Sequence, residues 1–168
     1  MLCKIVICSP LMTITGRVIT MKKAAIIYAS THHGSTRHVA EAIAQVHTVT
    51  LIDATKVQSA DLSVYDLIGF ASGIDFGRFY EPVLKFMRES LPEHKQVFFL
   101  YTCAKVSPRF TQDVRQIAAE KNAVLLGEYG CRGFNTYGPW KLVGGMNKGH
   151  PTQAELDSAV EFFEKLIH

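Results

Sequence analysis

A polar run at residues 30–36 has the composition of a phosphate-binding loop. It reads Ser30, Thr31, His32, His33, Gly34, Ser35 and Thr36, and its hydroxyl groups can donate hydrogen bonds. The run lies between a short apolar stretch and an amphipathic pattern, which predicts a helix N-terminus whose unpaired N–H groups and partial positive charge favour an anion. Gly34 lets the backbone curl close to a bound group. The pattern predicts a phosphate monoester site that needs no lysine or arginine; the alternative is a turn that only caps the helix.

Other phosphate and metal chemistries lack their residues. The chain has neither the G-x-x-x-x-G-K-[ST] pattern of nucleotide triphosphatases nor the G-x-G-x-x-G pattern of dinucleotide-binding folds. The first apolar stretch ends in Ser30 rather than in a phosphorylatable aspartate. Cysteines 3, 8, 103 and 131 form no C-x-x-C pair, and the histidines show no zinc spacing. We therefore expect no metal site and no catalytic residue, and we expect Cys103 to be a small buried residue.

The elements that must position this loop alternate between strand and helix. Apolar runs predict strands at 24–29, 48–52, 67–71, 96–102 and 123–129. Helices are expected to begin near Thr36, Pro82, Ser107 and Thr152, with prolines in two first turns and a capping box at 152–155. The alternation predicts a three-layer α/β fold with a doubly wound, five-stranded parallel sheet of order 2-1-3-4-5. Ligands of such sheets bind beyond the carboxyl ends of the strands.

Composition limits the setting in which the chain works. We expect residues 1–20 to be a weakly ordered extension and residues 21–168 to form one domain. The net charge is +3, of which Lys4 and Arg17 supply two, so the body is nearly neutral and no long basic run indicates nucleic acid. The mean hydropathy is +0.10, and no apolar run approaches the length of about 18 residues that suggests a membrane helix. A reduced, cytoplasmic protein with no stable membrane insertion is the simplest interpretation.

The loop and its surroundings resemble those of the flavodoxin family. Flavodoxin phosphate loops commonly read T-x-T-G-x-T, and residues 31–36 are similar, although His33 replaces the middle hydroxyl residue. The resemblance extends over residues 21–168. It implies that residues 30–36 bind the phosphate of flavin mononucleotide (FMN), and that the flavin ring lies between the loops after the third and fourth strands. The ring-binding residues it implies are Ser72, Gly73, Ile74, Asp75, Phe76, Gly77, Thr102, Cys103 and Ala104.

The two ring loops carry specific expectations. We expect Phe76 or Tyr80 to stack on the ring and Phe79 to pack under the following helix. The resemblance further implies that Gly73 or Gly77 changes its backbone conformation when the flavin is reduced. Arg78 and Lys105 lie in these loops and Asp75 is their main acid, so we expect a less negative reduction potential than acidic flavodoxins have. In the glycine-rich connection 130–150, we expect Tyr137 and Trp140 to pack onto the domain; the alternative is that they cover the flavin or contact a partner.

Two functions are compatible with a flavodoxin-like domain that binds FMN. The first is an FMN-dependent electron carrier that passes electrons between a reductase and an electron acceptor. It is favoured by small size and by the lack of an acid–base constellation. The second is a flavodoxin-fold oxidoreductase that acts on a quinone or a protoporphyrinogen-type substrate. It is favoured by residues 74–79, which resemble a loop of menaquinone-dependent protoporphyrinogen oxidases, and by the nearly neutral body.

Overall fold

The central sheet has the predicted topology. The computed structural model describes residues 13–14, 17–18, 22–31, 33–134 and 145–168. Five parallel strands form the sheet in the order β4-β3-β5-β7-β8. They are β3 (Ala24–Ala29), β4 (Val49–Asp53), β5 (Leu67–Asp75), β7 (Gln96–Cys103) and β8 (Val124–Arg132). In chain order this is the arrangement 2-1-3-4-5, so the expected fold is confirmed.

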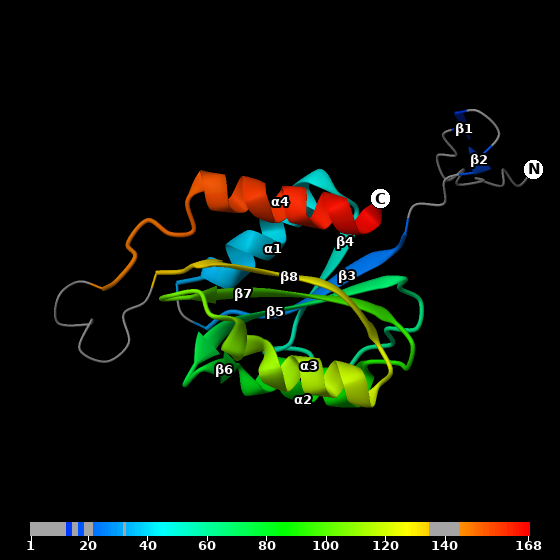
Figure 1. The fold of residues 1–168 in the computed structure, drawn as a ribbon, viewed down its shortest axis with the longest axis horizontal. Helices are drawn as coiled ribbons and strands as arrows, with labels where there is room; N and C mark the ends of the chain where they lie inside the picture. The colour runs from blue at the N-terminus through cyan, green and yellow to red at the C-terminus, as the bar shows by residue number, and fades with distance from the viewer. Residues whose placement is uncertain (1–12, 15–16, 19–21, 32, 135–144) are drawn as a thin grey trace, which may run out of the picture.

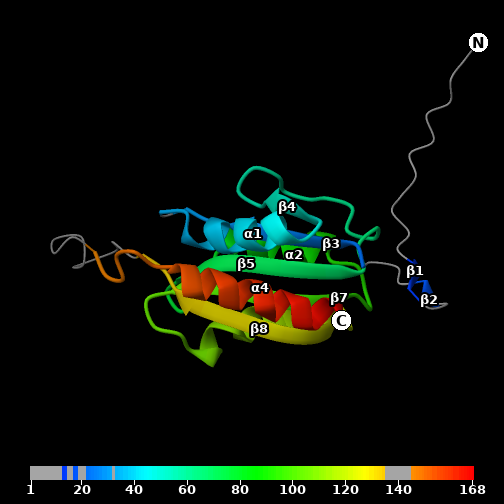
Figure 2. The same ribbon diagram turned by 90° about the horizontal axis from the view of Figure 1, so that it is seen from above.

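Helices cover both faces of the sheet. Helices α1 (Ser35–Val46) and α4 (Gln153–Ile167) lie side by side on one face, and α2 (Glu81–Ser90) and α3 (Gln112–Glu120) lie on the other (Figures 1 and 2). Each face has its own apolar core, one around Phe99 and Val83 and one around Phe98 and Ile43. Because helices cover both faces of the central strands, β3 is a continuous apolar run with every residue buried.

Local sequence signals explain how the helices begin. Pro82 lies in the first turn of α2, and Thr152 and Glu155 form the predicted capping box of α4. Ser107 caps the segment before α3, where its hydroxyl accepts a hydrogen bond from the Arg109 N–H. That segment starts as a short 3-10 helix, η1 (Pro108–Thr111), and becomes α-helical only at Gln112.

The chain after β5 forms a hairpin where the sequence suggested a loop beginning at Ser72. Strand β5 continues to Asp75 and pairs with β6 (Arg78–Phe79) in antiparallel register, with Ile74 opposite Phe79. Phe76 and Gly77 form the turn with φ values of 48° and 82°, the signs that a type I′ turn requires. Phe79 is only 1% exposed and packs against the core, as expected.

Two short strands precede β3. Strands β1 (Thr13–Ile14) and β2 (Arg17–Val18) pair with each other rather than with the central sheet. The division into an extension and a domain at residue 21 stays a prediction. Tyr137 and Trp140 lie outside the described residues. None of the helices in the described part has the length and hydrophobicity to cross a membrane.

Candidate functional site

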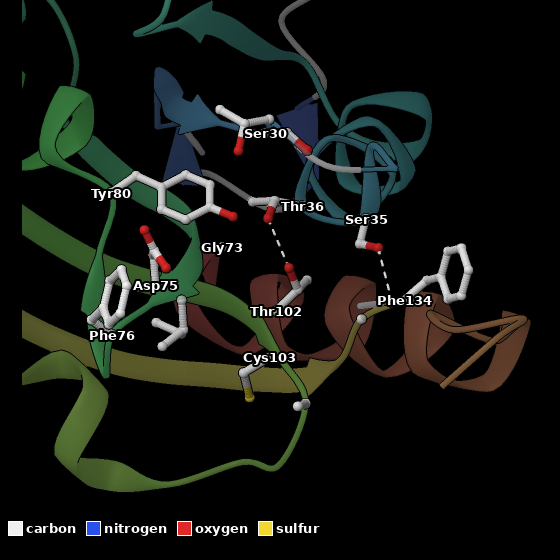
Figure 3. A pocket seen from close by; sticks show the side chains of 14 residues that line it. Ser30, Ser35, Thr36, Gly73, Asp75, Phe76, Tyr80, Thr102, Cys103 and Phe134 are labelled. Carbon is white, nitrogen blue, oxygen red and sulfur yellow. Dashed lines mark hydrogen bonds between the residues drawn. The ribbon is translucent and has the colours of Figure 1, made fainter. Parts of the chain in front are cut away.

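A pocket opens at the carboxyl ends of the strands, where the topology predicted a ligand site (Figure 3). Its volume is about 240 Å³. Four segments form its walls: the loop into α1, the β5–β6 hairpin, the end of β7 and the residues just after β8. The lining residues are Ser30, Thr31, Ser35, Thr36, Gly73, Ile74, Asp75, Phe76, Tyr80, Thr102, Cys103, Ala104, Gly133 and Phe134.

Most of the residues expected in the site line this pocket. Eleven of them do so: Ser30, Thr31, Ser35, Thr36, Gly73, Ile74, Asp75, Phe76, Thr102, Cys103 and Ala104. Four described candidates, His33, Gly34, Ser72 and Gly77, are not among its lining residues. His32 lies outside the described residues. The fold therefore brings together three loops that are far apart in the sequence.

The four residues away from the wall have other roles. Gly34 is the N-cap of α1 with φ 72°, and the His33 ring lies 4.2 Å from the Phe134 ring, between centroids. The fully buried Ser72 hydroxyl donates to the Gly73 carbonyl and accepts from the Tyr80 N–H. Gly77 is in the hairpin turn. Ser72 and Gly34 thus determine the local backbone conformation of the site, although neither residue lines the pocket.

One end of the pocket is rich in hydrogen-bond donors. Ser35 and Thr36 are 5% and 2% exposed, and they begin helix α1 beside the pocket. The Thr36 and Thr102 hydroxyl oxygens lie 2.8 Å apart (Figure 3). Helix α1 has a glycine N-cap, which offers no capping side chain, and its first turn has no acid. The positive end of the helix dipole therefore faces the pocket without a carboxylate to offset it, an arrangement that favours an anion.

The other end of the pocket is apolar and aromatic. Ile74, Phe76 and Tyr80 line it, and Phe76, at the hairpin turn, is 83% exposed. Gly73 allows the Tyr80 ring to approach, because a Cβ atom at residue 73 would lie 2.6 Å from the Tyr80 hydroxyl oxygen. The Tyr80 hydroxyl points into the pocket between the two ends (Figure 3). Flat aromatic faces of this kind suit a planar ring ligand.

Charged groups are sparse in the pocket wall. Asp75 is the only carboxylate among the fourteen lining residues, and none of them is a lysine, arginine or histidine. Arg78, which we expected to bring positive charge to the ring, forms ion pairs with Asp113 at 2.9 Å and Glu81 at 3.6 Å. Lys105 is exposed and does not line the pocket. The expected influence of Arg78 is therefore offset by two carboxylates.

Cys103 has the properties of a structural residue. It is 8% exposed, and burial raises the pKa of its thiol to about 11. The thiol is therefore protonated at neutral pH and is a poor nucleophile. Among the described residues, no group of three or more histidine, cysteine or acidic side chains is placed to bind a metal ion.

The segment after β8 contributes a wall of the pocket, through Gly133 and Phe134, that was not expected from the sequence. Gly133 is buried so tightly that a Cβ atom there would lie 3.1 Å from Cβ of Thr102 and 3.3 Å from Cβ of Ser35. Its N–H donates to the Cys103 carbonyl at 3.0 Å. The Phe134 N–H lies 3.2 Å from the His150 carbonyl oxygen and 3.3 Å from the Ser35 hydroxyl oxygen. The unusual length of the 130–150 connection was the one signal in the sequence.

Asn147 fastens this wall to the loop after β7. Its side-chain amide donates to the Ala104 carbonyl at 2.9 Å and to the Gly133 carbonyl at 3.5 Å. Asn147 has φ 60°, a left-handed conformation that asparagine tolerates better than most residues. One amide group therefore links two segments that both line the pocket, in addition to the hydrogen bond from the Gly133 N–H to the Cys103 carbonyl.

The substitution Asn147→Asp is expected to loosen both segments. It keeps the shape of the side chain but turns the donor into a carboxylate oxygen facing two carbonyls, which should lower the free energy of unfolding by about 1–2 kcal/mol. Hydrogen exchange at the Gly133 and Phe134 amides should become faster. Asn122→Asp is the matched control, because Asn122 is exposed and has φ 50°. Unchanged exchange at Gly133 and Phe134 would show that Asn147 does not hold the wall.

A family model and a sequence relative match this chain. The family model described as "Flavodoxin domain" matches residues 25–127. An uncharacterized protein of Methanocaldococcus jannaschii is 35% identical over 147 residues, which cover 86% of this chain and 98% of that protein.

Similar solved structures include two flavodoxins and a flavoprotein. A flavodoxin from the domain Archaea has a TM-score of 0.57 at 18% identity, covering 86% of this chain and 99% of its own. A flavodoxin of Streptococcus pneumoniae TIGR4 has a TM-score of 0.61 at 16% identity, with coverage of 85% and 96%. A Lactobacillus acidophilus NCFM flavoprotein, solved in complex with FMN, has a TM-score of 0.50 at 19% identity, with coverage of 65% and 93%. At these identities the likeness concerns the fold.

Proposed function

Because the chain belongs to the flavodoxin domain family, we propose that it binds FMN in this pocket and carries electrons between redox partner proteins. The observation that supports this most directly is the start of α1, where buried hydroxyls and an uncapped helix N-terminus border the pocket. Residues 30–36 would hold the phosphate. When bound, FMN would supply the electron-transfer chemistry.

The residues present fit the chemistry of FMN at both ends of the pocket. Hydroxyls of Ser30, Thr31, Ser35, Thr36 and Thr102 supply donors for a phosphate. The segments 73–76 and 102–104 would border the flavin ring, with Phe76 and Tyr80 as the aromatic surfaces. The cavity of about 240 Å³ is smaller than the roughly 300–1,000 Å³ of most enclosed small-molecule sites. A shallow site of this size would leave part of the ligand accessible for electron exchange.

The pocket supports a carrier better than a self-sufficient oxidoreductase. Its titratable lining groups are Asp75, Tyr80 and Cys103, and the cysteine is a protonated thiol at neutral pH. No paired acid and base stands among the fourteen lining residues. The second candidate, an oxidoreductase acting on a quinone or a protoporphyrinogen-type substrate, is favoured by the exposed Phe76, against which a planar substrate can stack.

The expected partners are a reductase and an electron acceptor, and the expected setting is the cytoplasm. Among the described residues, Cys103 and Cys131 are buried free thiols, which fits a reducing compartment. They belong to different cores, on opposite faces of the sheet. We do not expect nucleic acid to be a partner.

The proposal predicts a yellow protein whose flavin is released by acid and identified as FMN. The apoprotein should bind FMN at least about tenfold more tightly than riboflavin, because riboflavin lacks the group that the α1 donors would bind. Fluorescence titration measures both affinities. Failure to bind any flavin would refute the proposal, and equal affinities would refute the phosphate assignment. Steady-state turnover with NAD(P)H and a quinone, without a separate reductase, would select the oxidoreductase instead.

A further inference from the structure

The described segments that border the pocket carry an excess of positive charge. Residues 75–78, 104–109, 132–134 and 145–150 contain five cations, Arg78, Lys105, Arg109, Arg132 and Lys148, and one carboxylate, Asp75. Residues 21–168 as a whole have 16 basic and 15 acidic residues. The rest of the domain is therefore net negative, and the positive charge is concentrated at the carboxyl end of the sheet.

Four of these cations are available to a partner. Arg78 is offset by Asp113 and Glu81. Lys105, Arg109, Arg132 and Lys148 are exposed, and no ion pair within the described part of the chain involves them. Lys105 directly follows the lining residue Ala104, and Arg132 directly precedes the lining residue Gly133. Lys148 adjoins Asn147, whose amide reaches the Ala104 carbonyl.

Apolar side chains lie in the same loops as these charges. Phe76 is 83% exposed at the hairpin turn, and Val106 is 47% exposed beside Lys105. Transient protein interfaces usually have an apolar core and a charged, hydrated rim. The mouth of the pocket thus combines an apolar contact surface with a net positive charge.

We propose that the redox partner docks at this mouth through an acidic surface. The inference rests on the proposed function, because it assumes that electrons leave through the pocket. Opposite charges around an interface increase the rate of association and orient the encounter, and added salt screens this effect. The charge asymmetry of the domain turns the carboxyl end of the sheet toward an acidic protein before contact. Phe76 and Val106 then meet the apolar centre of the partner surface.

Two haem proteins of opposite charge test the sign of this surface. Photochemically reduced FMN-loaded protein is mixed with cytochrome b5, which has an acidic haem edge, or with the basic cytochrome c. Each reduced flavin delivers two electrons, one to each of two haem irons, and its protons pass to the buffer. The second-order rate constant should fall on the order of tenfold with added salt for cytochrome b5. For cytochrome c it should stay constant or rise.

Charge reversal localises the effect. The double variant Lys105→Glu/Arg109→Glu should remove or reverse the salt dependence with cytochrome b5. The matched control Lys22→Glu/Lys23→Glu changes the net charge equally, but its exposed lysines precede β3 at the opposite end of the sheet. Its salt dependence should remain close to that of the parent protein.

Three results would overturn the inference. The first is a rate constant for cytochrome b5 that rises with salt, and the second is a rate constant for cytochrome c that falls with salt. The third is an equal effect of the two double variants on the salt dependence with cytochrome b5. FMN uptake is measured first for every protein. A flavin-bound protein with the wrong salt dependence refutes the acidic partner alone, whereas absence of uptake refutes the proposed function and, with it, this inference.

Discussion

Thr36→Val is expected to weaken FMN binding by about 10- to 150-fold, the equivalent of losing one hydrogen bond to a charged group. Thr36 is 2% exposed and borders the pocket, and its hydroxyl oxygen lies 2.8 Å from that of Thr102. When Thr102 donates to Thr36, the Thr36 proton is free for a phosphate oxygen. Valine keeps the shape of the side chain and removes that donor. Fluorescence titration of the apoprotein with FMN measures the loss.

The Thr36→Val substitution also affects stability, and a second variant separates the two effects. Valine at residue 36 leaves the buried Thr102 hydroxyl without its partner, which should cost about 1–3 kcal/mol. Thr36→Val/Thr102→Val removes both hydroxyls, so stability should largely return. FMN affinity should not return. Thr36→Ser, which retains a hydroxyl, is the control for affinity. If the double variant regained both stability and affinity, the hydroxyls would only stabilise the fold and would not bind phosphate.

The positions of Ser35 and Thr36 in the fold could be predicted from the sequence because the signal there is local. The loop, the preceding strand β3 and the following helix α1 are contiguous, so composition and periodicity were enough to place Ser35 and Thr36 at a helix N-terminus. The common direction of the parallel strands then brought Thr102 to the same edge of the sheet. The 2.8 Å contact between the Thr36 and Thr102 hydroxyl oxygens was not expected from the sequence, which assigned the two residues to different parts of the ligand.

The segment after β8 could not be predicted in the same way. Asn147 contacts Ala104, 43 residues away, and the Phe134 N–H contacts Ser35, 99 residues away. Nothing in the residues around Asn147 indicates either partner. The β5–β6 hairpin was missed for a different reason: its turn is Phe76-Gly77, whereas the residue typical of the first position in a type I′ turn is asparagine, aspartate or glycine.

Gly69, in the core, is another residue whose role depends on a contact distant in the sequence. The sequence 67–71 reads LIGFA, which predicts a strand but gives no reason for a glycine at its centre. In the sheet, Gly69 pairs with Phe98 of β7, and a Cβ atom at residue 69 would lie 2.3 Å from Cζ of Phe98. The Phe98 ring is fully buried and packs against Phe163 of α4, with centroids 5.6 Å apart. The glycine is therefore required by the ring of Phe98, which is 29 residues away in the sequence. The same ring packs α4 against the sheet through its contact with Phe163.

Phe98→Ala is accordingly expected to be the most destabilising single change, lowering the free energy of unfolding by about 3–5 kcal/mol. Gly69→Ala should cost about 1–3 kcal/mol, because the ring must move from a filled core. In Gly69→Ala/Phe98→Ala the new methyl group occupies part of the space left by the ring. The double variant should therefore be less destabilised than the two single changes combined, by about 0.5–3 kcal/mol. Urea unfolding of the apoprotein measures all three variants, and strict additivity would mean that Phe98 does not account for the glycine.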